Sequence, residues 1–133
     1  MRPRLALSIG GVFYILLGLP GLLAPAQVLS AVGLPTHDVA LHLARDVGVL
    51  AIGVGIIDLL ARDAVGAPLR GLLWANIVIR IAAGVLTGFE IAAGVLPVTT
   101  FGGPAAVTYL TSIALIVMFG LALRRAYAFP VGA

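Results

Sequence analysis

Residues 41–63 read LHLARDVGVLAIGVGIIDLLARD, a stretch that is apolar enough to cross a bilayer but carries Arg45, Asp46 and Asp58. About 20 apolar residues of helix span the hydrocarbon core of a membrane. A charge inside that layer costs ~3 kcal/mol or more unless it finds a partner. The stretch therefore predicts a membrane helix whose charges face other helices.

The whole chain has the composition of an integral membrane protein. Its 133 residues are 62% hydrophobic and 10% charged, whereas about 25% of the residues in a soluble globular protein are charged. The pattern predicts an all-α fold, a single domain over residues 1–133 in which four transmembrane helices form a bundle. The expected spans are at about 5–23, 39–61, 69–92 and 104–123. They leave no room for a soluble domain, so the function must lie among the helices or in their connections.

The connection after the first span is itself apolar. Val28, Leu29, Val32 and Leu34 recur at near-helical spacing with little charge around them. This pattern predicts a short helix at the outer surface of the membrane.

The arginines predict how the bundle is oriented. They precede the first span, flank the second connection and follow the fourth span, at Arg2, Arg4, Arg62, Arg70, Arg124 and Arg125. The positive-inside rule then places the N- and C-termini in the cytoplasm. Membrane lipids are the expected partners of this charge, because the basic, aromatic-studded surface of a nucleic-acid-binding protein is missing.

Small residues recur within the predicted spans. Gly84 and Gly88 form a GxxxG motif, Ala51 and Gly55 are four apart, and Gly11 recurs at Gly18. Such residues let helix backbones approach closely in a membrane. Packing within one bundle is the simpler interpretation, and a homodimer contact through Gly84 and Gly88 is the alternative that the sequence leaves open.

The charges of the second and third spans predict a buried network. The short connection between these spans makes them antiparallel neighbours, and this places Arg80 near the bilayer centre, about five residues deeper than Asp46. Arg45, Asp46, Arg80 and Glu90 are then expected to pair inside the bundle. Such ion pairs can simply hold helices in register, but ionisable groups inside a membrane are also candidates for a functional site.

The candidate roles follow from these positions. Asp46 or Glu90 would act as proton donor or base, while Arg45 and Arg80 would tune it.

Three further residues are candidate ligand contacts. Tyr14 lies in the middle of the first span and needs a partner such as Asn76 or Arg80, so Tyr14 and Asn76 would orient a ligand. His42 could relay protons near the outer surface, although a solvated histidine is the simpler interpretation. Asp58 is expected to make a local pair with Arg62, four residues further on.

Several chemistries are excluded or disfavoured. The chain has no cysteine, which excludes disulfides, thiolate catalysis and cysteine-ligated metals. Its two histidines lack matching carboxylate spacing, and no phosphate loop or nucleophile elbow is present. We therefore predict neither a metal site nor a cofactor.

A resemblance to a known family rests on the first half of the chain. The segment LLAPAQVLSAVGLP at 22–35, followed by LARDVGVLAIGVGIIDLLARD at 43–63, resembles the DoxX-like group of small four-helix bacterial membrane proteins. The matching positions are Pro25, the Gly33-Leu34-Pro35 connection and the Arg45-Asp46-Val47-Gly48 motif. The resemblance implies a four-helix bundle in the bacterial inner membrane and, for some relatives, association with membrane redox complexes. It implies no settled reaction.

Three functions stay open from the sequence. The first is a protein that binds a lipophilic small molecule and catalyses acid–base chemistry on it, such as isomerisation, cyclisation or epoxide opening. The second is a non-catalytic subunit of a membrane redox complex. The third is a small proton-coupled transporter, working as a dimer through Asp46 or Glu90.

Overall fold

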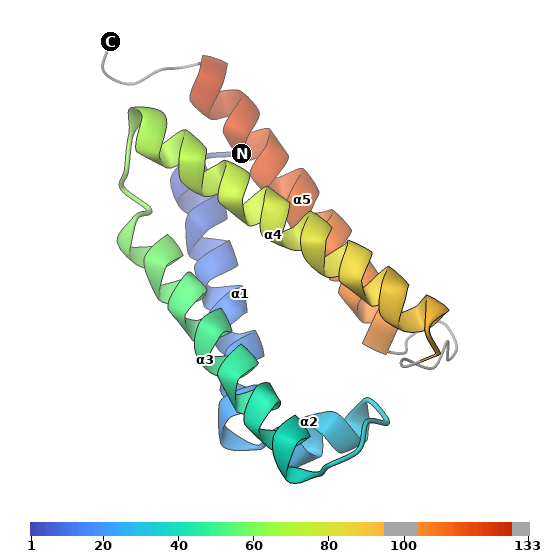
Figure 1. Ribbon diagram of the computed structural model, residues 1–133. Coiled ribbons are helices and arrows are strands. Elements are labelled where there is room, and N and C mark those ends of the chain that lie inside the picture. The colour runs from blue at the N-terminus through green and yellow to red at the C-terminus, as the bar shows by residue number, and fades with distance from the viewer. Residues whose placement is uncertain (95–103, 129–133) are drawn as a thin grey trace.

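A computed structural model describes residues 1–94 and 104–128, and every regular element in these ranges is a helix (Figure 1). The elements are α1 (Pro3–Leu23), α2 (Pro25–Ala31), α3 (Asp38–Leu60), α4 (Gly66–Ala92) and α5 (Pro104–Ala128). The all-α prediction is confirmed. The short helix predicted in the first connection is present as α2. It lies beside the C-terminal end of α1 and the N-terminal end of α3 (Figure 1).

Local sequence explains where several helices begin and end. Pro3 and Pro25 open α1 and α2, since proline favours the first turn of a helix, where its missing N–H is not needed. His37 caps α3 by accepting a hydrogen bond on Nδ1 from the backbone N–H of Ala40, at 3.2 Å. Gly66 has a positive φ of 65°, which lets the chain turn sharply from α3 into α4.

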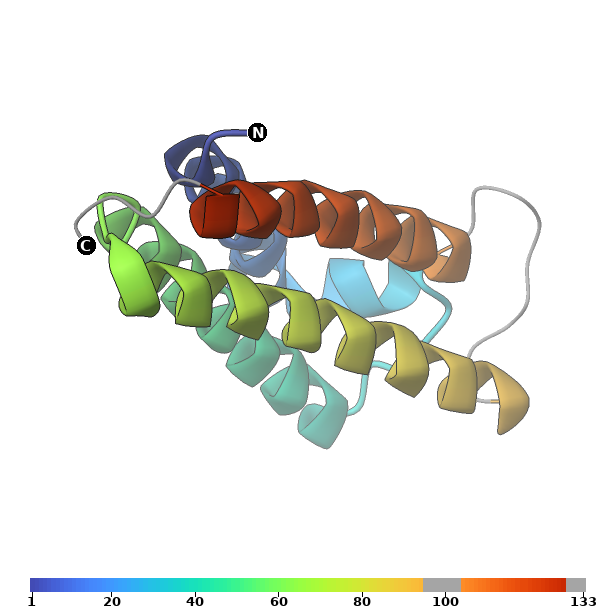
Figure 2. The same ribbon diagram turned by 90° about the horizontal axis from the view of Figure 1, so that it is seen from above.

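The long helices form two pairs. α1 packs along α3, and α4 packs along α5, whereas α3 and α4 do not pack closely along their lengths. The pair α4/α5 runs side by side in both ribbon views (Figures 1 and 2). The two pairs meet near the N-terminus of α1 and diverge toward α2 (Figure 1). The prediction that the second and third spans are close-packed neighbours is therefore wrong.

Glycines explain why α1 packs against α3. A Cβ atom at Gly11 would lie 2.7 Å from the carbonyl oxygen of Gly55, and one at Gly18 would lie 2.5 Å from that of Gly48. Gly11 and Gly18 are seven residues apart on α1, and Gly48 and Gly55 are seven residues apart on α3. The two sets therefore meet in register on antiparallel helices. We call these four residues the glycine seam. Their backbones are in contact, which no larger side chain would allow.

The GxxxG motif of α4 also packs within the bundle. A Cβ at Gly88 would lie 3.0 Å from the hydroxyl oxygen of Tyr109 on α5, and one at Gly84 would lie 3.9 Å from its ring. Close packing inside one chain thus accounts for Gly88 but does not require a glycine at Gly84, and the homodimer contact stays a prediction.

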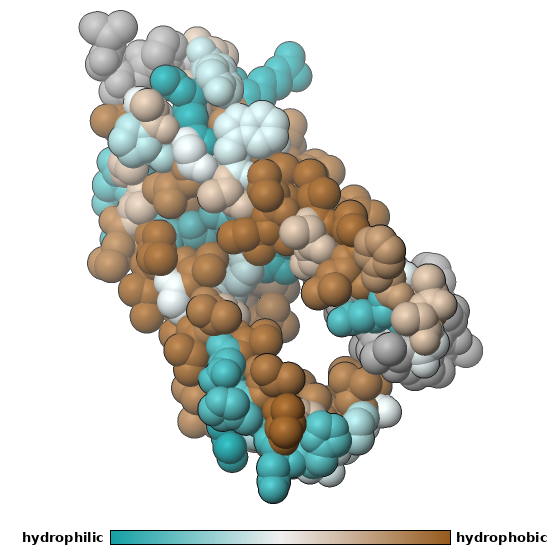
Figure 3. All heavy atoms as spheres, viewed as in Figure 1, coloured by the Kyte–Doolittle hydropathy of each residue, from teal (hydrophilic) through white to brown (hydrophobic). Residues whose placement is uncertain are grey.

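The outer surface is apolar, as expected of a protein surrounded by lipid. Within the part of the chain that the structure describes, three segments are long and apolar enough to cross a membrane: Pro3–Leu23, Gly66–Ala92 and Tyr109–Ala128. Large apolar side chains such as Leu16, Leu50 and Phe89 are mostly exposed, and brown apolar atoms cover much of the face in Figure 3. These features indicate that the protein is embedded in a membrane.

Candidate functional site

Four polar side chains from three helices are buried together near the middle of the bundle. Tyr14 comes from α1, Asp58 from α3, and Asn76 and Arg80 from α4; their exposed fractions are 5%, 1%, 2% and 6%. We call this group the polar centre. Asn76 donates a hydrogen bond from Nδ2 to Oδ1 of Asp58 at 2.8 Å. The guanidinium carbon of Arg80 lies 4.2 Å from the centroid of the Tyr14 ring.

Each helix positions its part of the polar centre by helical spacing. Asn76 and Arg80 are one turn apart on α4, so they face the same direction. Asp58 continues the face of α3 that carries Gly55, and that face packs on α1. Gly10 of α1 lies beside the carboxylate and leaves room for the Phe119 ring, because a Cβ there would lie 2.5 Å from Cζ of Phe119 and 3.4 Å from Oδ2 of Asp58.

The polar centre is incompletely bonded. Five of its buried atoms make no hydrogen bond of good geometry among the described residues: the Tyr14 hydroxyl, Asp58 Oδ2, Asn76 Oδ1, and Nε and Nη2 of Arg80. Of these, the Tyr14 hydroxyl and the Arg80 guanidinium are near enough to interact with each other. No ion pair joins Arg80 to Asp58. Leaving a buried donor or acceptor unpaired costs about 1–3 kcal/mol, and more for a charged group. The centre therefore presents both donors and acceptors that a ligand could bind.

Cation–π contacts compensate part of the cost of burying Arg80. Its guanidinium also lies 5.2 Å from the centroid of the Phe13 ring. Such contacts contribute about 0.5–2 kcal/mol, the larger value where the cation is desolvated. They hold the guanidinium in place from two neighbouring residues of α1 but satisfy none of its N–H donors.

The structure brings three of the predicted site residues together and separates the other four from them. Tyr14, Asn76 and Arg80 meet, as the sequence predicted. Asp46 instead lies on the exposed side of α3 and pairs with Nε2 of His42 at 3.5 Å.

Arg45 and Glu90 lie outside the polar centre as well. Arg45 is exposed, and Glu90 is half-buried two to three turns from Arg80 along α4. The predicted network of Arg45, Asp46, Arg80 and Glu90 is therefore not formed. The glycine seam explains the difference: Asp46 precedes the buried Gly48 by two residues, about 200° around the helix, so packing on α1 turns Asp46 outward.

Asp58 is the functional candidate that the sequence analysis misassigned. Its predicted local pair with Arg62 is wrong, because Oδ1 of Asp58 accepts from Asn76 and the Nε of Arg62 pairs with Asp63 at 3.7 Å. A signal was present in the sequence: Asp58 lies three residues after Gly55, on the small-residue face that packs against another helix.

An apolar cavity of about 570 Å³ lies between α1, α2 and α3, toward the α2 end of the molecule. Its walls include Gly18 and Gly21 of α1, Leu29 of α2 and Ala51 of α3, and Glu90 of α4 reaches it. In Figure 3, an opening is visible in this part of the molecule, with brown apolar atoms on its α3 side and teal hydrophilic atoms on part of the opposite side.

The residues that line this cavity do not include the four side chains of the polar centre, but helical spacing places the two close together along α1 and α3. Tyr14 lies one turn before Gly18 on the same face of α1, and Asp58 lies two turns after Ala51 on the same face of α3. These offsets correspond to about 6 Å and about 10 Å along the helix axes. The cavity walls and the polar centre are thus successive parts of the same inward faces.

The donor set does not resemble a metal site. Within residues 1–94 and 104–128, no three histidine, aspartate or glutamate side chains gather as metal ligands would. The acceptors of the polar centre are one carboxylate, one amide and the Tyr14 hydroxyl, beside a guanidinium that would repel a cation. The arrangement is better suited to an organic molecule that accepts hydrogen bonds from Arg80.

Comparisons with known proteins give no family for the chain. No family model matches it, and no significant match is found among curated proteins or solved structures. The functional argument therefore depends on the site geometry.

Proposed function

We propose that this protein binds an amphiphilic small molecule inside the membrane, with the molecule's polar head at the polar centre and its apolar part in the cavity beside α1 and α3. The observation that carries the proposal is the set of five buried polar atoms without a hydrogen bond of good geometry, contributed by Tyr14, Asp58, Asn76 and Arg80. A group of side chains serving only to hold helices together would be expected to bond these atoms to one another.

The proposal includes a specific membrane arrangement. α1, α3, α4 and α5 each cross the bilayer, both termini are cytoplasmic, and α2 lies at the outer surface. The six terminal and connecting arginines support this orientation through the positive-inside rule. The resemblance to the DoxX-like group adds the bacterial inner membrane as the expected location.

The polar centre defines what the ligand head must contain. Nε and Nη2 of Arg80 can donate to a carbonyl or anionic oxygen, and Oδ1 of Asn76 can accept from a hydroxyl or amine. The apolar cavity would accommodate a hydrocarbon chain or ring attached to that head. A lipophilic carbonyl compound with a neighbouring hydroxyl group fits both parts.

Acid–base catalysis is the reaction class that this centre supports best. Asp58 has one oxygen held by Asn76 and the other unpartnered, so it can take a proton from the carbon beside a carbonyl. Arg80 would stabilise the negative charge that develops on the carbonyl oxygen. Returning the proton to a different carbon completes an isomerisation without any co-reactant.

The experiment compares ligand retention by buried and exposed variants. Wild type, Arg80→Met and Asp58→Asn would be purified in mild detergent, and their bound small molecules extracted and measured by mass spectrometry. Arg45→Met and Asp46→Asn are matched controls, since they make the same chemical changes at exposed positions of α3. We expect an amphiphile in wild type and both controls, and its loss from both buried variants.

Two results would contradict the proposal. Equal retention in all five proteins would show that the polar centre does not hold the ligand. No bound molecule in a wild type reconstituted with the native membrane extract would favour a purely structural role. Helical circular dichroism and size-exclusion elution of each variant separate loss of ligand from loss of fold. The complex-subunit and transporter hypotheses stay predictions.

A further inference from the structure

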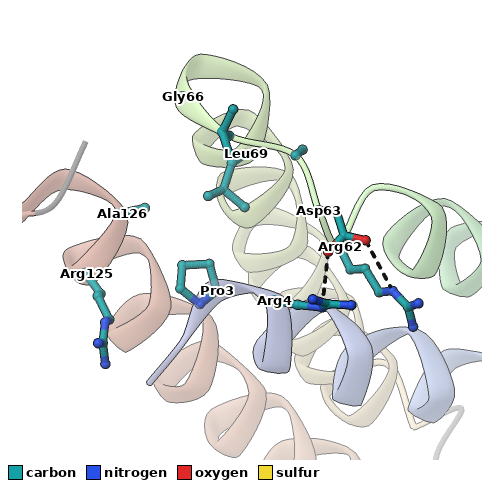
Figure 4. A pocket seen from close by; sticks show the side chains of 10 residues that line it. Pro3, Arg4, Arg62, Asp63, Gly66, Leu69, Arg125 and Ala126 are labelled. Atoms are coloured by element: carbon teal, nitrogen blue, oxygen red, sulfur yellow. Dashed lines mark ion pairs between the residues drawn. The ribbon is translucent and has the colours of Figure 1, made fainter. Parts of the chain in front are cut away.

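A second cavity, of about 420 Å³, lies at the opposite end of the molecule from α2. It is bordered by the start of α1, the turn between α3 and α4, and the end of α5 (Figure 4). Arg4, Arg62 and Arg125 line it together with one carboxylate, Asp63. We propose that this cavity binds the phosphate group of an anionic phospholipid.

Asp63 orients two of the arginines toward each other. Its Oδ1 lies 3.1 Å from Nε of Arg4, and its Oδ2 lies 3.7 Å from Nε of Arg62. Figure 4 shows Arg4 of α1 reaching Asp63, while Arg62 pairs with it from the neighbouring position in the α3–α4 turn. Both ion pairs use Nε, so the terminal nitrogens of each guanidinium still have N–H groups to donate. Both pairs are largely exposed to the surroundings, so they bring two guanidiniums near one carboxylate at a surface that a tetrahedral anion can reach.

Basic side chains outnumber acidic ones in the lining of this cavity, which favours an anion. The cavity has three arginines and one aspartate, which gives a formal charge of 3 − 1 = +2. Arg2 and Arg124 lie nearby in the chain but do not line it. Arg70 is already placed over the ring of Tyr127, with its guanidinium carbon 5.2 Å from the centroid.

The apolar part of the cavity selects a lipid over a free anion. Pro3, Val65, Leu69 and Ala126 form walls beside the arginines. A phosphate attached to a glycerol and acyl chains would place its charge at the guanidiniums and its ester region on these walls. The inference depends on the membrane embedding of the helices but is independent of the polar centre and its ligand.

The test uses variants with equal changes of net charge. Each protein would be incorporated into nanodiscs, and lipid binding would be measured by native mass spectrometry after titration with phosphatidylglycerol or phosphatidylcholine. Wild type should retain phosphatidylglycerol preferentially. Arg4→Gln/Arg62→Gln should weaken this binding about tenfold or more, because both guanidiniums beside Asp63 are lost. Arg2→Gln/Arg124→Gln should change it by no more than about twofold.

Equal losses in both double variants would overturn the proposal in favour of diffuse electrostatic attraction. The variant Arg4→Lys/Arg62→Lys keeps the net charge and replaces the glutamine variant if that one does not fold. We expect it to bind phosphatidylglycerol clearly more weakly than wild type, because lysine cannot form the bidentate contact. Wild-type affinity in the lysine variant would overturn the proposal. Inorganic phosphate is the third arm: displacement of the lipid at millimolar phosphate would overturn the lipid assignment, and no displacement would support it.

Discussion

At the scale of single residues, Asp58 and Asp46 show how position on one helix decides the role of a carboxylate. Both lie on α3, but Asp58 is 1% exposed and bonded to Asn76, whereas the Asp46 side chain is 56% exposed beside His42. A carboxylate surrounded by protein must obtain its hydrogen bonds there, whereas an exposed one can use water or headgroups. Removal of a partner should therefore have different consequences at the two sites.

A double-mutant cycle tests this difference. Asp58→Ala or Asn76→Ala alone should lower the free energy of unfolding by about 1–3 kcal/mol, because each leaves a buried polar partner unpaired. The double variant should be less destabilised than the sum, by about 1 kcal/mol, a typical coupling for hydrogen bonds between membrane helices. Unfolding in detergent followed by circular dichroism gives these values.

The exposed pair supplies the control for this cycle. Asp46→Ala and His42→Ala should each change stability by less than about 0.5 kcal/mol, with little coupling, as measured for exposed ion pairs. Additive effects of Asp58→Ala and Asn76→Ala would show that their hydrogen bond contributes nothing to the fold.

The polar centre was predictable from the sequence only in part. Tyr14, Asn76 and Arg80 stand out because polar groups in the middle of an apolar span need partners inside the protein. The carboxylate was assigned to Asp46 because depth was estimated by assuming that α3 lies against α4. Depth along a helix does not fix rotation about its axis, and the partner helix that sets this rotation is not given by chain order.

At the scale of elements, the glycine seam determines which helices pair. Gly11 and Gly18 on α1 meet Gly55 and Gly48 on α3 with backbone contact. Their equal spacing was visible in the sequence, but glycines also recur elsewhere in the chain, so the correct pairing needed the three-dimensional structure. This contact orients the rest of α3, and therefore places Asp58 inside the bundle.

Substitutions at two glycines of α3 distinguish the effect of helix–helix packing on stability from the effect of helix propensity. Gly55→Ala would place Cβ 2.5 Å from the Gly11 carbonyl oxygen, so we expect α1 and α3 to separate and stability to fall by about 1–3 kcal/mol. Gly53→Ala is the matched control, because a Cβ there meets nothing within contact distance. It should be neutral or stabilising by up to about 1 kcal/mol. Thermal unfolding in the same detergent compares them, and similar effects of both variants would contradict the seam.

At the scale of the whole molecule, charged, polar and apolar regions follow one another along the length of the bundle. Arg4, Arg62 and Arg125 gather at one end, the polar centre lies between the helix pairs, and the apolar cavity opens toward α2. A ligand that entered sideways between the diverging pairs could reach the polar centre without crossing the arginine end. This arrangement requires that α3 crosses the membrane together with the other long helices.

Cysteine labelling tests that requirement. The chain has no cysteine of its own, so only the introduced residue can react. Thr36 precedes α3 and Ala67 lies at the start of α4, and both are exposed. If α3 spans the bilayer with the termini inside, Thr36→Cys should react with a membrane-impermeant maleimide on intact cells, whereas Ala67→Cys should react only after lysis. Labelling of both or of neither on intact cells, with both reactive after lysis, would place the two ends of α3 on one side. Labelling of Ala67→Cys alone would keep the span and reverse the orientation. The cavity near α2 faces the outer leaflet only in the first of these cases, so the result decides from which side of the membrane a ligand reaches Arg80.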